Sequence, residues 1–78
     1  MDVSALFVAE RALLLIYMNA DNELENGTAW DVDDSSRYRA DALRRLNRRG
    51  IYPFYDEIAQ AYCYRVERGK DWIDDYVF

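Results

Sequence analysis

The sequence predicts an all-α protein, a small single-domain bundle of three or four short helices within residues 1–78. Three observations predict this class. Apolar residues recur at helical spacing over two long stretches, and both stretches carry helix-cap signals. Only three glycines and one proline interrupt the 78 residues. The content of 51% apolar and 15% aromatic residues is too high for a disordered tail.

The first helix is expected over residues 3–20, where Leu6, Leu14 and Tyr17 belong to one helical stripe. Asp2 or Ser4 can cap its start. Residues 12–18 are apolar on every side, unlike a surface helix. This favours a central position in the bundle, and the alternative is a surface shared with another chain.

Residues 21–34 are polar and acidic, and they are expected to form a long connection with a turn signal at Asn26-Gly27. Long connections without structure of their own are often functional. Trp30 lies in this segment rather than on an apolar stripe. It is interpreted as a core anchor, with an interface residue as the alternative.

The second helix, over 35–49, has the clearest signals. The residues Asp33, Asp34 and Ser35 offer N-caps, and Arg48 and Arg49 suit the negative end of the helix dipole. Gly50 can take the left-handed position that ends a helix. The apolar stripe of this helix consists of Tyr38, Ala42, Leu43 and Leu46.

A third helix is expected over 53–62, because Pro53 suits a first helical position and Asp56 and Glu57 would follow in the first turn. Residues 62–66 alternate in character, so a strand there, in a winged-helix-like α+β fold, is the alternative. Helix or strand stays open for 62–68. A final short helix with Trp72 and Ile73 is expected to pack back on the core.

The composition excludes several functions. There is no histidine and a single cysteine, Cys63, so a disulfide framework, an ordinary zinc or copper site and the usual histidine base are excluded. Asp21, Glu23 and Glu25 have calcium-loop spacing, but the loop would need Gly and Glu where Asn26 and Val32 stand. No phosphate-binding loop is present. We therefore expect no catalytic residue, no metal and no cofactor.

The net charge of −5 is unevenly distributed. Residues 1–36 carry a net −7, residues 37–49 a net +5 and residues 50–78 a net −3. The arginines of 37–49 could pair with the protein's own acidic segments, above all 21–34, or with an external anion such as nucleic acid. Acidity could instead reflect host composition, because aspartate and arginine dominate the charged residues.

Residues 56–64 read Asp-Glu-Ile-Ala-Gln-Ala-Tyr-Cys-Tyr, and Trp72-Ile73 follow. This segment resembles the helix-turn-helix of bacterial repressors, and residues 48–53 are similar to the approach to that motif in repressors of the LexA type. The resemblance implies that Arg65, Arg68 and Lys70 face DNA. It departs from the family where Cys63 replaces the turn glycine.

The leading functional hypothesis is a small acidic, non-enzymatic protein that inhibits or regulates a partner by occupying its surface. By size and charge it resembles inhibitors carried by phages and mobile elements, including anti-CRISPR proteins and DNA mimics. The partner would be a protein with a basic surface, such as a nucleic-acid-binding complex. The residues expected to meet it are Asp21, Glu23, Glu25, Trp30, Asp31, Asp33, Asp34, Asp71, Asp74 and Asp75.

Two alternatives remain. One is a DNA-binding regulator that holds nucleic acid through Arg37, Arg44, Arg45, Arg48, Arg49, Arg65, Arg68 and Lys70. The other is a homodimer through residues 3–18. No secretory signal or membrane-spanning stretch is recognisable, so a cytoplasmic location away from membranes is expected.

Overall fold

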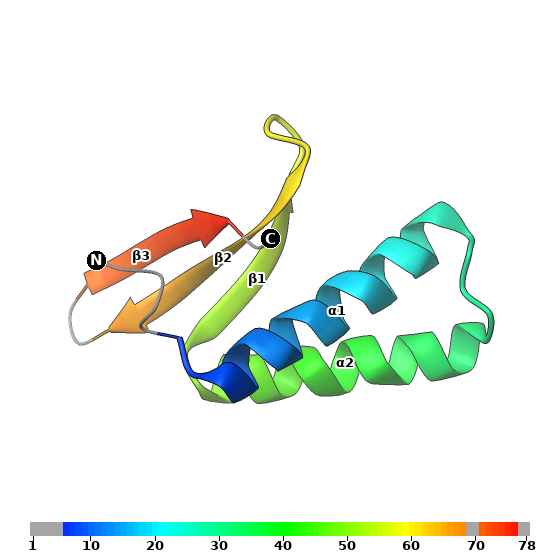
Figure 1. Ribbon diagram of the computed structural model, residues 1–78, viewed down its shortest axis with the longest axis horizontal. Helices are drawn as coiled ribbons and strands as arrows, with labels where there is room; N and C mark the ends of the chain where they lie inside the picture. Colours follow the sequence, from blue (N-terminus) through cyan, green and yellow to red (C-terminus); the bar gives the residue numbers. More distant parts are fainter. Residues whose placement is uncertain (1–5, 69–70, 77–78) are drawn as a thin grey trace.

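The protein is an α+β domain in which a helical hairpin is followed by a three-stranded sheet (Figure 1). This computed structural model describes residues 6–68 and 71–76. The elements are α1 (Val8–Asn26), α2 (Val32–Arg48), β1 (Ile51–Asp56), β2 (Ala61–Arg68) and β3 (Asp71–Tyr76). The strands form an antiparallel meander in the order β1-β2-β3. The prediction of an all-α bundle of three or four helices is therefore wrong.

α1 begins at Val8 and runs further than the sequence predicted. The backbone N–H of Phe7 donates to Glu10 Oε1 at 3.0 Å, which satisfies one of the free donors at the helix start. The helix ends at Asn26 because Gly27 adopts the left-handed conformation with φ of 68°. Residues 21–26 are thus helical, and the predicted long connection shrinks to residues 27–31.

α2 confirms the predicted second helix and begins three residues earlier. Its N-cap is Asp31, whose Oδ1 accepts a hydrogen bond of 3.1 Å from the N–H of Asp34. Ala42 and Leu46 of the predicted stripe are buried, whereas Tyr38 is exposed. The two helices pack side by side in opposite directions (Figure 1).

The predicted third helix is wrong, because residues 51–56 form β1 and residues 57–60 form a turn. β1 is an edge strand paired only with β2, so it can accept Pro53, which has no N–H to donate. Asp56 Oδ1 caps the turn by accepting from the N–H of Ile58 at 3.0 Å and of Ala59 at 3.3 Å. The acidic pair expected at a helix start therefore stabilises a hairpin turn.

The alternative of a strand at 62–66 is confirmed, because β2 covers this segment. Tyr64 and Val66 are buried while Arg65 and Glu67 are exposed, which is the alternation of a half-buried strand. β3 replaces the predicted final helix, and the packing of Trp72 and Ile73 lies outside the described side chains. The segment that resembles a helix-turn-helix thus forms a turn at residues 57–60 and strands in its other described parts, instead of two helices.

The core lies between the helical hairpin and the sheet. Its buried side chains are Leu6, Leu14, Leu46, Ile51, Tyr64 and Val66, with Leu13 and Tyr17 packed against them. Leu14 faces this core, but Leu15 and Ile16 are 44% and 46% exposed. The favoured central position for residues 12–18 is therefore wrong, because the sheet covers only one face of the hairpin.

Trp30 is fully exposed at the linker between the helices. The interpretation of Trp30 as a core anchor is wrong. The linker is only five residues long and lies at the end of the hairpin away from the sheet (Figure 1), so Trp30 does not reach the core between the helices and the sheet.

Candidate binding surfaces

A cleft of about 510 Å³ opens between the second half of α1 and the β1–β2 hairpin. We call it the acidic cleft. Its described lining combines three carboxylates with four aromatic rings and contains no lysine or arginine. The lining residues are Tyr17, Asp21, Asn22, Glu25, Asn26, Pro53, Phe54, Tyr55, Glu57 and Tyr62.

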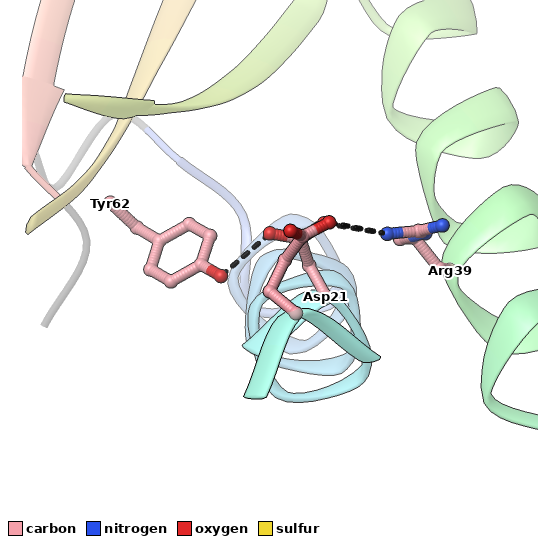
Figure 2. Close-up of polar contacts among 4 residues, drawn as sticks. Asp21, Arg39 and Tyr62 are labelled. Atoms are coloured by element: carbon pink, nitrogen blue, oxygen red, sulfur yellow. Dashed lines mark hydrogen bonds and ion pairs between the residues drawn. The ribbon is translucent and has the colours of Figure 1, made fainter. Parts of the chain in front are cut away.

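Asp21 joins three elements at the wall of this cleft (Figure 2). Its Oδ2 accepts a hydrogen bond of 2.6 Å from the hydroxyl of Tyr62 on β2. Its Oδ1 accepts from Arg39 Nη1 on α2 at 2.9 Å. Arg39 also lies 3.6 Å from Glu25 Oε1. The side chain of Asp21 is 16% exposed and that of Glu25 is 71% exposed, so Glu25 remains open to a ligand.

The two tyrosines beside Asp21 are harder to ionise than tyrosine in water. Burial raises the pKa of Tyr62, and the hydrogen bond to Asp21 and the charge of Asp21 raise it further. Burial also raises the pKa of Tyr17, and the charge of Asp21 adds to that effect. Both hydroxyls therefore stay neutral, and Tyr62 remains a hydrogen-bond donor to Asp21.

The aromatic part of the cleft is built on the hairpin. The rings of Tyr55 and Tyr62 face each other across β1 and β2 with centroids 5.1 Å apart and planes at 62°, an edge-to-face contact. Phe54 and Tyr55 are partly exposed. Ring faces next to carboxylates attract cations, so the cleft is suited to a lysine or arginine side chain.

A second surface lies on the side of the helical hairpin away from the sheet, and we call it the outer groove. Its described lining residues come from α1, α2 and their linker, together with Arg49, which directly follows α2. One end of the groove, which we call the acidic end, has a volume of about 420 Å³. Its lining there consists of Ile16, Asn19, Ala20, Glu23, Trp30, Asp31, Asp34, Ser35 and Tyr38.

The basic end of the outer groove holds about 730 Å³ and is lined by Ala9, Ala12, Leu13, Ile16, Asp41, Arg44, Arg45, Arg48 and Arg49. Asp41 neutralises part of this charge through Arg44 at 2.7 Å and Arg45 at 3.0 Å. Arg49 Nη1 lies 3.9 Å from Glu10 Oε2. Arg48 has no ion pair within the described parts of the chain.

Internal pairing thus accounts for most of the arginines of 37–49. Arg39 pairs with Asp21 and Glu25, which belong to the acidic segment 21–34. Arg37 pairs with Asp34 one turn earlier in α2. Pairs between exposed side chains, such as Arg37–Asp34, are each of small energy. The ion pairs lower the positive surface potential of α2, and Arg48 remains its least compensated cation.

The predicted acidic surface is divided among separate places. Asp21 and Glu25 line the acidic cleft, whereas Glu23, Trp30, Asp31 and Asp34 line the outer groove on another face of α1. Asp33 is exposed on the first turn of α2 and lines neither. The structure therefore does not bring the predicted set together as one site.

The C-terminal part of the predicted sites lies on the sheet. Asp74 of β3 accepts two hydrogen bonds from Arg65 of β2, at 2.7 and 3.0 Å, so these opposite charges compensate each other. Asp75 is half-buried on β3. Arg68 and Asp71 are register partners whose side chains are outside the described set, and Lys70 is outside the described residues.

Sequence reasoning missed the aromatic half of the cleft. Tyr55, Tyr62 and Glu57 were assigned to a helix, and Tyr17 was assigned to a core stripe. The alternation of residues 62–66 is the sequence signal that indicates a strand at Tyr62, and Tyr55 is its partner on the neighbouring strand.

Across residues 6–68 and 71–76, no group of acidic or cysteine side chains is arranged to hold a metal ion. The same described residues include no helix of the length and apolarity needed to cross a membrane.

Comparison of the chain with protein families, with curated proteins and with solved structures finds no match.

Proposed function

We propose that this protein is a small, non-enzymatic binding protein that inhibits or regulates a macromolecular partner by occupying a basic part of its surface. The observation that carries this proposal is the acidic cleft, where carboxylates and aromatic rings converge and no described lining residue is cationic. An inhibitor of a nucleic-acid-binding protein is one class that would use such a cleft, because phosphate-binding surfaces are rich in arginine and lysine.

A basic side chain of the partner would enter between α1 and the β1–β2 hairpin. Its charged head would meet Glu25 and Glu57, which are exposed, while its aliphatic stem would lie on Phe54 and Tyr55. A cation over an aromatic face gains about 0.5–2 kcal/mol, depending on how far it is desolvated. One such contact gives weak binding, so the rest of the affinity would come from the surfaces around the cleft.

The cleft walls are held in place before binding. The Tyr62–Asp21–Arg39 contacts join the hairpin, α1 and α2, and they neutralise much of the charge on Asp21. A pre-formed site loses less entropy when a ligand binds. These contacts therefore hold the cleft walls in position, while the carboxylates that would meet the ligand are those of Glu25 and Glu57.

DNA binding, the alternative, has less support. Three of the four arginines at the basic end of the outer groove already contact Asp41 or Glu10. The segment expected to supply a recognition helix is extended where it is described. A gel-shift titration at low salt would detect such binding, which should weaken steeply as salt rises.

The proposal is tested by titrating ¹⁵N-labelled protein with a short peptide that contains one arginine, and with the same peptide carrying lysine or glutamine. The basic peptides should shift the amide resonances of Tyr17, Glu25, Tyr55 and Tyr62, and the glutamine peptide should not. Shifts spread evenly over the surface, or equal shifts with the glutamine peptide, would contradict the proposal.

Two matched variants sharpen this test. Glu57→Gln and Asp33→Asn each remove one exposed carboxylate that has no ion pair in the described chain. Glu57→Gln should weaken binding of the arginine peptide roughly threefold, whereas Asp33→Asn should leave it unchanged. Equal weakening by both would show a general charge effect rather than a site.

A further inference from the structure

Among the described residues, no element covers the face of the two-helix layer that carries the outer groove. Helices with an apolar stripe normally bury it against a second layer, and here the sheet covers only the opposite face. Ile16 is shared by the linings of the acidic and basic ends and is 46% exposed. The small side chains of Ala9 and Ala12 are exposed on the same helix. Small residues allow another backbone to approach this floor closely.

Charge reverses from one end of the outer groove to the other. On α2, Asp34 and Arg48 lie on the groove side, seven residues before and after Asp41. On α1, Glu23 and Ala9 lie seven residues after and before Ile16. At a rise of 1.5 Å per residue, each of these positions is ~10 Å from the centre of its helix segment. The acidic and basic ends are thus equidistant from one midpoint, marked by Ile16 and Asp41.

A surface with this pattern is complementary to itself. A two-fold axis that lies in the interface, perpendicular to the helices, places the acidic end of one copy on the basic end of the other. An axis parallel to the helices would place like charges together, which costs several kcal/mol. Charge therefore selects a single symmetric arrangement, with each helix antiparallel to its equivalent in the second copy.

We propose that the outer groove is the interface of a homodimer, in which two helical hairpins form a four-helix layer with the sheets on the outside. Ile16 meets Ile16 of the second copy near the axis. Arg48, the arginine without an ion pair among the described residues, meets Asp34 of the second copy. The exposed rings of Trp30 and Tyr38 face the arginines of the opposite basic end, where cation–π contacts can form.

The size of the face fits a weak but specific dimer. Helices of 19 and 17 residues, each about 10 Å wide, cover on the order of 500 Å² per copy, so about 1,000 Å² in total. That is the lower end of the range for biological interfaces. Dimerisation in the micromolar range is expected. The acidic cleft lies on another face and stays open in both copies, so the dimer does not depend on the proposed function.

Sedimentation equilibrium from low micromolar to millimolar concentration tests the dimer. The mass should rise from 9.3 kDa towards twice that value. Ile16→Asp should abolish the rise, while Leu15→Asp is the matched control, because Leu15 is equally exposed but does not line the groove. A wild-type mass that stays at 9.3 kDa throughout, or equal disruption by both variants, would overturn the proposal.

A charge exchange tests the antiparallel arrangement. Arg48→Glu alone, and Asp34→Arg alone, should each raise the dimer Kd at least about tenfold, because each places like charges together twice. An equimolar mixture of the two variants should recover the wild-type Kd as a heterodimer, because both contacts then join opposite charges. If circular dichroism shows that Asp34→Arg does not fold, Glu23→Arg replaces it. A mixture of folded variants that stays monomeric overturns the proposed arrangement.

Discussion

The hydroxyl of Tyr62 donates a 2.6 Å hydrogen bond to the carboxylate of Asp21 and so connects β2 with α1 across 41 positions of the chain (Figure 2). The carboxylate is held from the other side by Arg39, so the three groups act as one network. This network determines where the acidic cleft lies, because it sets the position of the β1–β2 hairpin beside α1.

Tyr62→Phe should lower the free energy of unfolding by about 1 kcal/mol, because the variant removes one hydrogen bond to a charged and largely buried acceptor. Urea denaturation followed by circular dichroism measures this change. Tyr55→Phe is the control, since its hydroxyl has no hydrogen bond in the described chain and its ring keeps the contact with Tyr62. Equal losses in the two variants would show that the Tyr62–Asp21 bond contributes nothing specific.

Alkaline pH should destabilise the wild type more than Tyr62→Phe. The pKa of Tyr62 is raised in the folded protein above its ordinary value of 10.0. The folded state therefore keeps a proton that the unfolded chain loses, so the stabilisation is complete below pH 10 and falls as pH rises above it. Tyr17, whose pKa is also raised, contributes in the same direction. Urea midpoints measured from pH 8 to pH 11 should decline more steeply in the wild type, and parallel declines would contradict this account.

Asp31→Ala should lower the free energy of unfolding by about 1 kcal/mol, because α2 loses the side chain that accepts from the N–H of Asp34. Asp33→Ala removes an equally exposed carboxylate from the same turn but no cap, so a loss of a few tenths of a kcal/mol is expected. Thermal denaturation of both variants distinguishes them. If Asp33→Ala is the more damaging, the helix begins where the sequence predicted rather than at Val32.

Trp30→Ala should change the free energy of unfolding by no more than about 0.5 kcal/mol, because the side chain is fully exposed. Leu46→Ala, at a fully buried position, should cost about 3 kcal/mol and serves as the reference for a core residue. The same Trp30 variant should raise the Kd of the proposed homodimer. A large loss of stability from Trp30→Ala would instead show that this ring is part of the core.

The two helices were largely predictable because their signals are local. Asn26-Gly27 marked the end of α1, although it was interpreted as a turn inside a longer connection. The acidic residues before Ser35 and the arginines near Gly50 marked both ends of α2. The polarity of residues 21–26 predicts a connection, whereas the structure extends α1 through them. Two of these polar residues, Asp21 and Glu25, contact Arg39, a partner that lies on another element.

The strands were not predictable in the same way. Pro53, Asp56 and Glu57 fit a helix start as well as they fit an edge strand followed by a turn. What decides between them is pairing: Phe54 with Cys63 and Ile51 with Val66 in the register of β1 and β2. Alternation at Tyr62, Tyr64 and Val66 was the one local sign of this outcome, and it favoured the alternative that the structure confirms.

The sequence by itself determined two helices, the lack of histidine and disulfide chemistry, and the separation of acidic from basic segments. These features depend on composition, on caps and on contacts three or four residues apart, all of which are local. Only the tertiary structure decided that residues 51–56, 61–68 and 71–76 form a sheet, that Trp30 is exposed and that the acidic residues divide between a cleft and a groove. Hydrogen bonds between strands join residues that are distant in the chain, and so do the contacts that determine which side chains face the core. Both exist only once the hairpin and the sheet have come together.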